Sequence, residues 1–412
     1  MMMSLLGKGT YGFVYTAETL PENSCIKVYR RRMPSMFYRQ MALFNLLRGQ
    51  DAREFVQTHF LIASDVARVN GGYIGYIMPL CAHDLYRHVL DNGPLIGDPF
   101  VELHDQLCEA VGYLNHNLGI LHCDISPSNV IRSRENDRWL LCDFDLWRPV
   151  HAARGLAYTK SMRAPELLLE CDHEASALAA EVWALGMTLD YANRGNLLSS
   201  PDSHPLEIVE HVVPRFMRHA RDLTREMWLR VPYMCAVVEK RPPDWHVYRD
   251  MLRVRPQDRR SMGLLDLCIN TKAPMSRLSV RGGICLQTRR ECLDLIIGVP
   301  GCPKTLLCAM VIVDAYLSVV GEQDYHGHHV YLALSALLLA EAFFMDNHCD
   351  VKHLRLQTSL AVLNNYVFHV AKTCEWSIPF GTSAWSQDIN EGTLVEMLLR
   401  PCNVYKKFEF LF

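Results

Sequence analysis

The sequence HCDISPSN at residues 122–129 decides the fold of this 412-residue chain. Ahead of it, residues 101–118 carry apolar side chains at helical spacing, which predicts a helix that ends just before the motif. After it come LCDF at residues 141–144 and RAPE at residues 163–166. The three runs follow one another in a definite order, and two further motifs lie nearer the N-terminus.

A glycine-rich run, GKGTYGFV at residues 7–14, lies between two segments of strand-like composition. Its glycines let backbone N–H groups approach phosphates without interference from a Cβ atom. Such a run alone also fits an ordinary tight turn. Here it is followed by Lys27 at the end of the apolar run 25–27, and a lysine buried there would be costly unless it held an anion.

Together these five motifs resemble the protein kinase family, and the resemblance covers about residues 4–270. It implies an α+β chain with a two-lobed protein kinase fold, in which a small β-rich lobe precedes a large helical lobe. The residue pattern agrees with a β-rich start, because it predicts strands at 4–6, 13–17, 24–29 and 73–78 and a helix at 36–47.

The resemblance also implies how the chain would bind ATP and Mg²⁺. The residues that match the family's phosphate-binding positions are Gly7, Gly9, Gly12 and Lys27, the last as a point charge on the α- and β-phosphates. The residues that match its adenine slot are Leu6, Val14, Cys25, Met78 and Ile131, with Leu80 and Cys81 at the hinge.

The catalytic residues implied by the resemblance are Asp124, Lys27 and Asn129. Asp124 would accept or orient the proton of the substrate hydroxyl, and Asn129 and Asp143 would hold Mg²⁺. Thr159, in the expected substrate loop, favours a serine or threonine acceptor. Outside this set, Glu166 and Arg259 match a pair that ties the substrate loop to the large lobe without taking part in the chemistry.

Several residues depart from the family pattern: Gln40 for the helix glutamate, Cys123 for the H-R-D arginine, Ser126 for the catalytic-loop lysine, Asp145 for the D-F-G glycine and Glu181 for the large-lobe helix aspartate. Gln40 still offers a hydrogen-bond acceptor to the strand lysine, although a charge-assisted bond is about twice as strong. Because the nucleotide lysine, the base and the metal ligands remain, an active enzyme is favoured. The alternative is a pseudokinase or nucleotide-binding scaffold that regulates a partner without phosphotransfer.

The run PSMFYRQ at residues 34–40 stands where cyclin-dependent kinases carry their P-S-T-A-I-R-E helix. The Pro-Ser start, Arg39, the G-x-G-T-Y-G loop and Asp84-Leu85 after the hinge all resemble that subfamily. The alternative is an amphipathic helix of any kinase small lobe.

The C-terminal part resembles a cyclin box, a five-helix domain, over about residues 284–380. The resemblance rests on the order of apolar helical segments at 288–296, 304–318 and 334–341, although Glu341 replaces the cyclin-box lysine. The alternative is a generic helical extension of the kinase. A cyclin-like module in cis would contact the 34–40 helix and activate the kinase, with Met36 and Phe37 as the expected contacts unless they pack in the small lobe's own core.

The expected domain organisation follows from these patterns. It comprises a protein kinase domain at 1–270 (small lobe 1–80, large lobe 81–270), a linker at 271–283, an all-α cyclin-box-like domain at 284–380 and a C-terminal extension at 381–412. The linker sequence, TKAPMSRLSVRGG, has no apolar period and contains Pro, Ser and Gly.

Composition narrows the classes of partner. Lys plus Arg total 42 and Asp plus Glu total 45, so the formal net charge of −3 gives no overall basic footprint for nucleic acid or an anionic membrane. The two most apolar stretches, 306–320 and 331–345, are too short to span a bilayer. We therefore expect a protein substrate, no nucleic acid and no membrane.

Cysteine usage and the N-terminus predict the compartment. Fifteen cysteines are scattered along the chain without a C-x-x-C pair, and the start, MMMSLLGKGTYG, lacks the features of a secretory signal. These features predict a reducing compartment, the cytoplasm or the nucleus. Compact loops and the departures from the family pattern suit a viral protein acting in a host cell.

Overall fold

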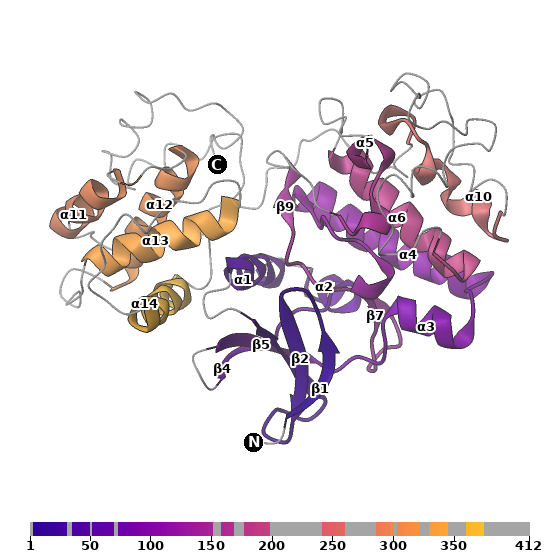
Figure 1. The fold of residues 1–412 in the computed structure, drawn as a ribbon, viewed down its shortest axis with the longest axis horizontal. Helices are drawn as coiled ribbons and strands as arrows, with labels where there is room; N and C mark the ends of the chain where they lie inside the picture. Colours follow the sequence, from indigo (N-terminus) through magenta and orange to yellow (C-terminus); the bar gives the residue numbers. More distant parts are fainter. Residues whose placement is uncertain are drawn as a thin grey trace. The chain divides into compact units, whose positions relative to one another are not determined.

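An antiparallel sheet of five strands opens the chain in the computed structural model (Figure 1). The strands are β1 (Met3–Lys8), β2 (Gly12–Ala17), β3 (Ser24–Tyr29), β4 (Asp65–Val69) and β5 (Tyr73–Pro79), in the order β1-β2-β3-β5-β4. The sequence predicted all of these strands except β4. That strand lies at the sheet edge and exposes Asp65 and Arg68, so it lacks a clear apolar alternation.

The structure describes residues 3–30, 35–49, 52–69, 73–150, 158–168, 177–197, 241–259, 286–297, 299, 303–320, 329–344 and 360–374. The predicted linker at 271–283 and the predicted extension at 381–412 lie outside the described residues.

Helix α1 (Ser35–Arg48), predicted at 36–47, packs on one face of the sheet through aromatic rings. The ring of Phe37 lies edge-on to Tyr29 of β3 with centroids 5.8 Å apart, and the ring of Phe44 lies edge-on to Tyr76 of β5 at 5.4 Å. Phe37 is fully buried. The structure thus places Phe37 in the core between α1 and the sheet, which was the alternative to its expected role as a docking contact.

The described C-terminal part consists of helices packed around α13. They are α11 (Leu286–Ile297), α12 (Pro303–Val320), α13 (His329–Phe344) and α14 (Leu360–Thr373). Helix α13 contacts each of the other three helices, and apolar side chains such as Val313, Leu337 and Val367 are buried among them. Arg289 of α11 and Asp314 of α12 form a buried ion pair, with 2.7 Å between Nε and Oδ1, so neither charge is left without a partner.

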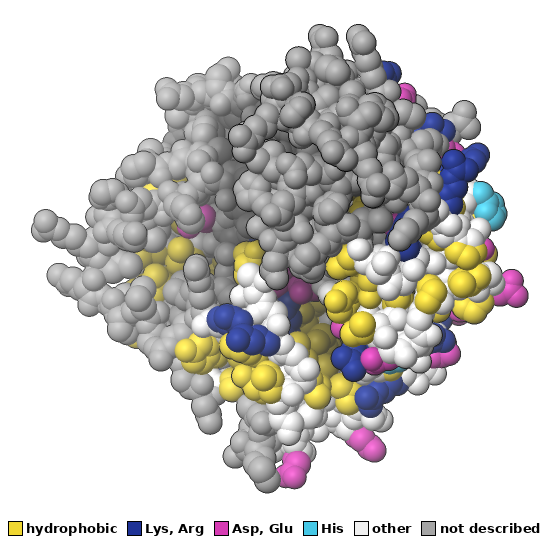
Figure 2. Space-filling model, turned by 45° about the vertical axis from the view of Figure 1, so that its right-hand side comes forward, with side chains coloured by type: hydrophobic (Ala, Val, Ile, Leu, Met, Phe, Trp, Pro, Cys, Tyr) yellow, Lys and Arg dark blue, Asp and Glu magenta, His cyan; other side chains and the backbone are white. Residues whose placement is uncertain are grey.

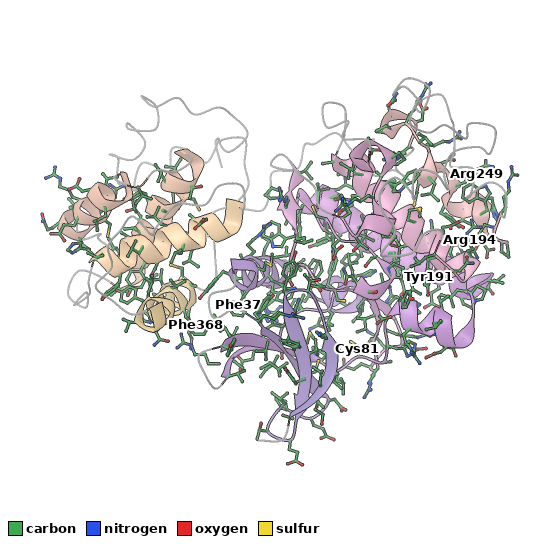
Figure 3. The ribbon with its side chains drawn as sticks, in the orientation of Figure 1. Phe37, Cys81, Tyr191, Arg194, Arg249 and Phe368 are labelled. Carbon is green, nitrogen blue, oxygen red and sulfur yellow. The ribbon has the colours of Figure 1, made fainter. Side chains whose placement is uncertain are left out.

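The C-terminal helices also contact the region of the sheet. Helix α13 packs against α1. The guanidinium of Arg68, on β4, donates a hydrogen bond of 2.7 Å to Oδ1 of Asn365 and lies 4.0 Å from the ring centroid of Phe368, both on α14. Figure 3 labels Phe368 on this helix. In line with these contacts, residues 1–53, 63–79 and 272–412 form one compact unit, and residues 54–62 and 80–271 form another.

The second unit is mainly helical and is built around α6 (Ala177–Arg194), whose side chains are all buried from Ala179 to Asn193. Its other helices within the described residues are α2 (Arg53–His59), α3 (Leu85–Asn92), α4 (Asp98–Gly112), α5 (Pro165–Leu168) and α10 (Trp245–Tyr248), with short helical turns at Tyr113–Asn117, Pro127–Asn129, Lys160–Met162, Arg249–Leu252 and Pro256–Asp258. Two small antiparallel sheets pair β6 (Ile120–Leu121) with β9 (Arg148–Pro149) and β7 (Val130–Arg132) with β8 (Trp139–Leu141).

The described surface mixes charge signs. On the face drawn in Figure 2, basic and acidic side chains are interspersed with hydrophobic ones. Among the described helices, none combines the length and the apolar character that a membrane crossing requires.

Candidate active site

The sheet brings four of the predicted nucleotide-binding residues to one face. In the strand register Val14 lies opposite Lys27, and Cys25 lies opposite Met78. Directly opposite residues share a face, as do residues two apart along a strand, so all four side chains point the same way. Tyr29, two residues after Lys27, points to this face as well, and it contacts α1 there. The predicted residues therefore line the face that α1 also covers.

The glycine-rich turn is held by its own backbone and by Arg30. The N–H of Gly9 donates to the carbonyl of Gly12 at 2.9 Å, and Nη2 of Arg30 donates to the carbonyl of Gly9 at 2.8 Å. A Cβ atom at Gly12 would lie 2.7 Å from the carbonyl oxygen of Val28, whereas one at Gly9 would meet nothing closer than 3.7 Å. Of these two glycines, only Gly12 is thus required by close packing against the backbone, because a Cβ atom at Gly9 would make an ordinary contact.

Lys27 is 8% exposed and lies near the aromatic face of Tyr29, with Nζ 5.3 Å from the ring centroid. Its strand approaches β5 closely, because a Cβ atom at Gly75 would collide with the Lys27 carbonyl oxygen. Oε1 of Gln40 accepts a 2.6 Å hydrogen bond from the hydroxyl of Tyr29. Sequence reasoning missed Tyr29 as a partner of Gln40, and the expected bond from Lys27 to Gln40 stays a prediction.

The hinge residues lie beside β7 in the second unit. The N–H of Ala82 donates to the carbonyl of Arg132 at 2.8 Å, and Ile131 pairs with Asp84 in a β-bridge. Cys81, predicted at the hinge, and Ile131, predicted at the adenine slot, are therefore brought close in space. Burial raises the pKa of the Cys81 thiol to about 11, so this side chain is a neutral, largely buried group at pH 7.

Asp124 is held by neighbours that the sequence placed in the same motif. Nδ2 of Asn129 donates to its carbonyl at 2.7 Å and to its Oδ2 at 3.0 Å. Burial raises the pKa of Asp124 to about 6, and the charge of Asp143 contributes in the same direction.

Thr159 is another hydrogen-bond partner of Asp124. Its hydroxyl donates to Oδ1 of Asp124 at 2.8 Å, and its backbone N–H donates to the same oxygen at 3.2 Å. These hydrogen bonds stabilise the charged carboxylate and so lower its pKa, against the effect of burial. Thr159, from which the sequence predicted a serine or threonine acceptor, thus forms hydrogen bonds directly to the expected base.

His122 links the two motifs that carry the carboxylates. Its Nδ1 accepts from the N–H of Asp124 at 3.2 Å, so Nε2 carries the proton and donates to the carbonyl of Cys142 at 3.0 Å. Burial lowers the pKa of His122 to about 4, so the ring is neutral at pH 7. Because Cys142 precedes Asp143, the His122 ring connects the segment that carries Asp124 to the segment that carries Asp143.

Glu181 of α6 holds the backbone of the catalytic loop. Its Oε1 accepts from the N–H of His122 at 2.6 Å, and its Oε2 accepts from the N–H of Cys123 at 2.9 Å and from the hydroxyl of Tyr158 at 3.2 Å. The first two contacts connect the catalytic loop to the core helix. The third, from Tyr158, was missed, because nothing in the sequence joins a tyrosine to a glutamate 23 positions away.

The expected pair of Glu166 and Arg259 forms in the structure. Nη1 of Arg259 donates to Oε1 of Glu166 at 2.6 Å, and Nη2 donates to Oε2 at 2.5 Å. Both side chains are buried, and Arg259 also donates to the backbone carbonyls of Arg253, Val254 and Ala179. This pair ties α5 to the end of the unit and contacts no residue of the predicted catalytic set.

The donor set fits a magnesium ion. Both hydrogen bonds of the Asn129 amide use Nδ2, so its carbonyl oxygen Oδ1 remains available as a ligand. Asp143 supplies a carboxylate, and the mutual charge effect of Asp143 and Asp124 would be relieved by a cation. Amide and carboxylate oxygens are the ligands that Mg²⁺ prefers.

A family model and several curated proteins match this chain, and all of them are protein kinases. A family model described as the protein kinase domain matches residues 2–281. The chain is 32% identical over 173 residues to serine/threonine-protein kinase SKS1 of Saccharomyces cerevisiae, covering 37% of this chain and 32% of that protein. It is 28% identical over 250 residues to mitogen-activated protein kinase homolog NTF6 of Nicotiana tabacum, covering 52% and 65%.

A further similar protein is named as a cell division control protein. The chain is 25% identical over 220 residues to cell division control protein 2 homolog 3 of Trypanosoma brucei brucei, covering 50% of this chain and 67% of that protein. The chain thus spans from about a third to about two thirds of the length of these relatives.

Proposed function

Because the chain belongs to the protein kinase family, we propose that it is an ATP-dependent protein kinase that transfers the γ-phosphate to a serine or threonine hydroxyl. The setting of Asp124 carries the proposal. Asn129 and Thr159 fix its carboxylate by hydrogen bonds, and its pKa of about 6 leaves it ionised at neutral pH while making it a better proton acceptor than an ordinary aspartate.

Each predicted residue has a physical role in this reaction. Lys27 supplies a fixed positive charge for phosphate oxygens, and the glycine-rich turn lets backbone N–H groups approach them. Asp124 orients the acceptor hydroxyl and takes its proton. Asn129 and Asp143 would hold Mg²⁺, which when bound neutralises charge on phosphate oxygens.

Two observations support a serine or threonine acceptor. SKS1, one of the similar proteins, is named a serine/threonine-protein kinase. In this chain the Thr159 hydroxyl lies on Asp124, so a hydroxyl of similar size is already accommodated beside the base.

The test is phosphotransfer by the full chain from γ-labelled ATP with Mg²⁺ to a mixed peptide library, followed by phosphoamino-acid analysis. Asp143→Asn and Asp124→Asn should each lower transfer by at least about a hundredfold, because each removes a charge used in the transition state. Tyr248→Phe, in a buried pair with Asp190 away from these residues, is the control. Equal labelling by wild type and Asp143→Asn would favour the scaffold alternative.

We further propose that residues 284–380 form a cyclin-box-like module that acts in cis on α1, so that the enzyme resembles a cyclin-dependent kinase with its activator attached. Support comes from the packing of α13 against α1 and from the contacts of Arg68 with Asn365 and Phe368. The similarity to a cell division control protein 2 homolog points to the same subfamily. A brace on α1 would hold Gln40 and Tyr29 in place beside Lys27.

Arg68→Ala in the full chain tests this module. It removes one hydrogen bond and one cation–π contact, so kcat should fall by about threefold to tenfold while the bulk of the fold persists. Arg87→Ala is the matched control, because Arg87 makes only an exposed pair with Asp91 among the described ion pairs. Equal kcat values for the two variants would show that the contact with α14 does not assist catalysis.

We also propose that the protein works in the cytoplasm or nucleus. The described cysteines, among them Cys25, Cys142 and Cys308, are all thiols, which suits a reducing compartment. Loss of activity after oxidation, with recovery on adding a thiol reductant, is the expected result in solution.

A further inference from the structure

Tyr158 is a buried tyrosine whose hydroxyl and backbone carbonyl both form hydrogen bonds. Its side chain is 2% exposed, and its hydroxyl donates to Oε2 of Glu181 at 3.2 Å. Its backbone carbonyl accepts from Nε of Arg163 at 2.8 Å. Burial and the charge of Glu181 raise the pKa of the phenol, so the hydroxyl keeps its proton and acts as the donor. Neither contact belongs to the catalytic set described above.

The carboxylate that receives Tyr158 is the one that holds the catalytic loop. Glu181 accepts the backbone N–H groups of His122 and Cys123. Burial raises the pKa of Glu181 to about 7, and the hydrogen bonds from Cys123, His122 and Tyr158 oppose that rise. Glu181 therefore joins two segments that are remote in sequence. One segment leads into Asp124, and the other leads into Thr159.

The residue after Tyr158 reaches Asp124 itself. Thr159 donates two hydrogen bonds to Oδ1 of Asp124, from its hydroxyl and from its backbone N–H. Because Tyr158 and Thr159 are adjacent, holding the phenol on Glu181 restricts where the Thr159 backbone can lie. The two tethers form a closed circuit through the catalytic loop: Tyr158 to Glu181, Glu181 to the backbone ahead of Asp124, and Asp124 back to Thr159.

Two features of the sequence indicate a function for this circuit of hydrogen bonds. The run 144–157, FDLWRPVHAARGLA, contains no hydroxyl residue that could carry a phosphate. Position 123, an arginine in the family pattern, is Cys123, so it offers no guanidinium to a phosphate. Some other contact must then hold the substrate end of the segment on the catalytic loop.

We propose that Tyr158 is a positioning residue, whose hydrogen bond to Glu181 holds Thr159 against Asp124 and so orders the substrate end of the segment without phosphorylation. The role rests on the proposed kinase function, which it deepens. Tyr158 touches neither substrate nor nucleotide in this scheme and acts through Thr159. A tyrosine that only filled space would do so equally well without its hydroxyl.

Tyr158→Phe in the full chain isolates the hydroxyl, since it keeps the ring and its packing. Tyr248→Phe is the matched control, because the Tyr248 hydroxyl donates to Oδ1 of Asp190 at 3.0 Å and is likewise a buried phenol on a carboxylate of α6. Two measurements are made on each: kcat and KM for ATP, and backbone hydrogen exchange of the peptide that contains Thr159.

Tyr158→Phe should lower kcat by about tenfold with KM for ATP changed by less than about twofold, and exchange at Thr159 should quicken by about tenfold. Tyr248→Phe should leave both quantities unchanged. Equal exchange of this peptide in the two variants would overturn the proposal, whatever the activity. If wild type transfers no phosphate but Tyr158→Phe alone quickens exchange, the tether stands and the kinase function fails.

Discussion

Replacing Thr159 by valine should move the acid limb of the kcat profile to higher pH. Burial raises the pKa of Asp124 to about 6, and the Thr159 hydroxyl at 2.8 Å is one of the donors that keep it from rising further. Valine has the same shape but lacks that donor. With the donor gone, the charged carboxylate is less stabilised, so its pKa rises and Asp124 becomes protonated at a higher pH.

The size of the shift follows from the geometry. A hydrogen bond to a charged group contributes about 1.5–3 kcal/mol, and one pKa unit corresponds to about 1.4 kcal/mol, so the upper bound is about two units. Two donors remain on the carboxylate, the Thr159 N–H at 3.2 Å and Nδ2 of Asn129 at 3.0 Å. They offset part of the loss, and we expect the limb of Thr159→Val to lie about one pH unit above that of the wild type under the same conditions.

The assay is kcat at saturating Mg·ATP and peptide, between about pH 5 and pH 9. Thr188→Val is the control: it makes the same exchange of hydroxyl for methyl at a buried threonine whose hydroxyl donates to the Ala184 carbonyl within α6. The control should keep the wild-type limb. An unchanged limb in Thr159→Val, or one displaced to lower pH, would refute the assignment of Asp124 as the titrating base.

Two further predictions concern the frame of the site. Gly12→Ala should lower the melting temperature of the nucleotide-free protein more than Gly9→Ala does. Only Gly12→Ala places a Cβ atom close to the backbone, 2.7 Å from the Val28 carbonyl oxygen. Equal melting temperatures for the two variants would contradict this steric argument. Glu166→Gln should destabilise the protein by about 3–5 kcal/mol in urea unfolding, because it leaves Arg259 charged and buried. Asp91→Asn, in an exposed pair, should cost less than about 1 kcal/mol, and a similar small loss for Glu166→Gln would count against the buried pair.

Contiguous motifs were predictable from sequence because their chemistry is local. Asp124 and Asn129 lie five positions apart, and the structure joins them by two hydrogen bonds. The strands that carry Val14 and Lys27 were also predictable, because each is a short run of strand-forming residues bounded by glycine-rich or Pro/Asn-containing turns. The pairing of Glu166 with Arg259 came from the family pattern, because 93 positions separate the two residues.

Partners that meet only in the folded chain were not predictable. The bond from Tyr29 to Gln40 depends on where α1 crosses the sheet, and that crossing is set by aromatic packing rather than by any spacing in the sequence. The same reason explains Phe37, whose exposure could not be judged before the position of Tyr29 was known. Strand β4 was missed for another reason, because an edge strand needs little apolar alternation.

The centre of the site stores backbone strain that its neighbours hold in place. Cys123 and Asp143 have left-handed backbone conformations, with φ of 64° and 61°. For a non-glycine residue this costs about 1–3 kcal/mol and persists only where the surroundings over-determine it. The N–H of Cys123 is held by Glu181, and Cys142, next to Asp143, donates its N–H to the carbonyl of Asn129 at 2.9 Å.

These anchors explain how the chain can depart from the family at positions 123 and 145 without losing the arrangement around Asp124. Each anchor uses a backbone group: Glu181 accepts the N–H of His122, the Asn129 carbonyl accepts the N–H of Cys142, and His122 Nε2 donates to the Cys142 carbonyl. None of these bonds uses the side chain at position 123 or 145. The longer Glu181 even reaches a third donor, Tyr158. At positions 123 and 145 the side chains that differ are therefore not those that bond to the predicted base, and an intact catalytic loop is compatible with Cys123 and Asp145.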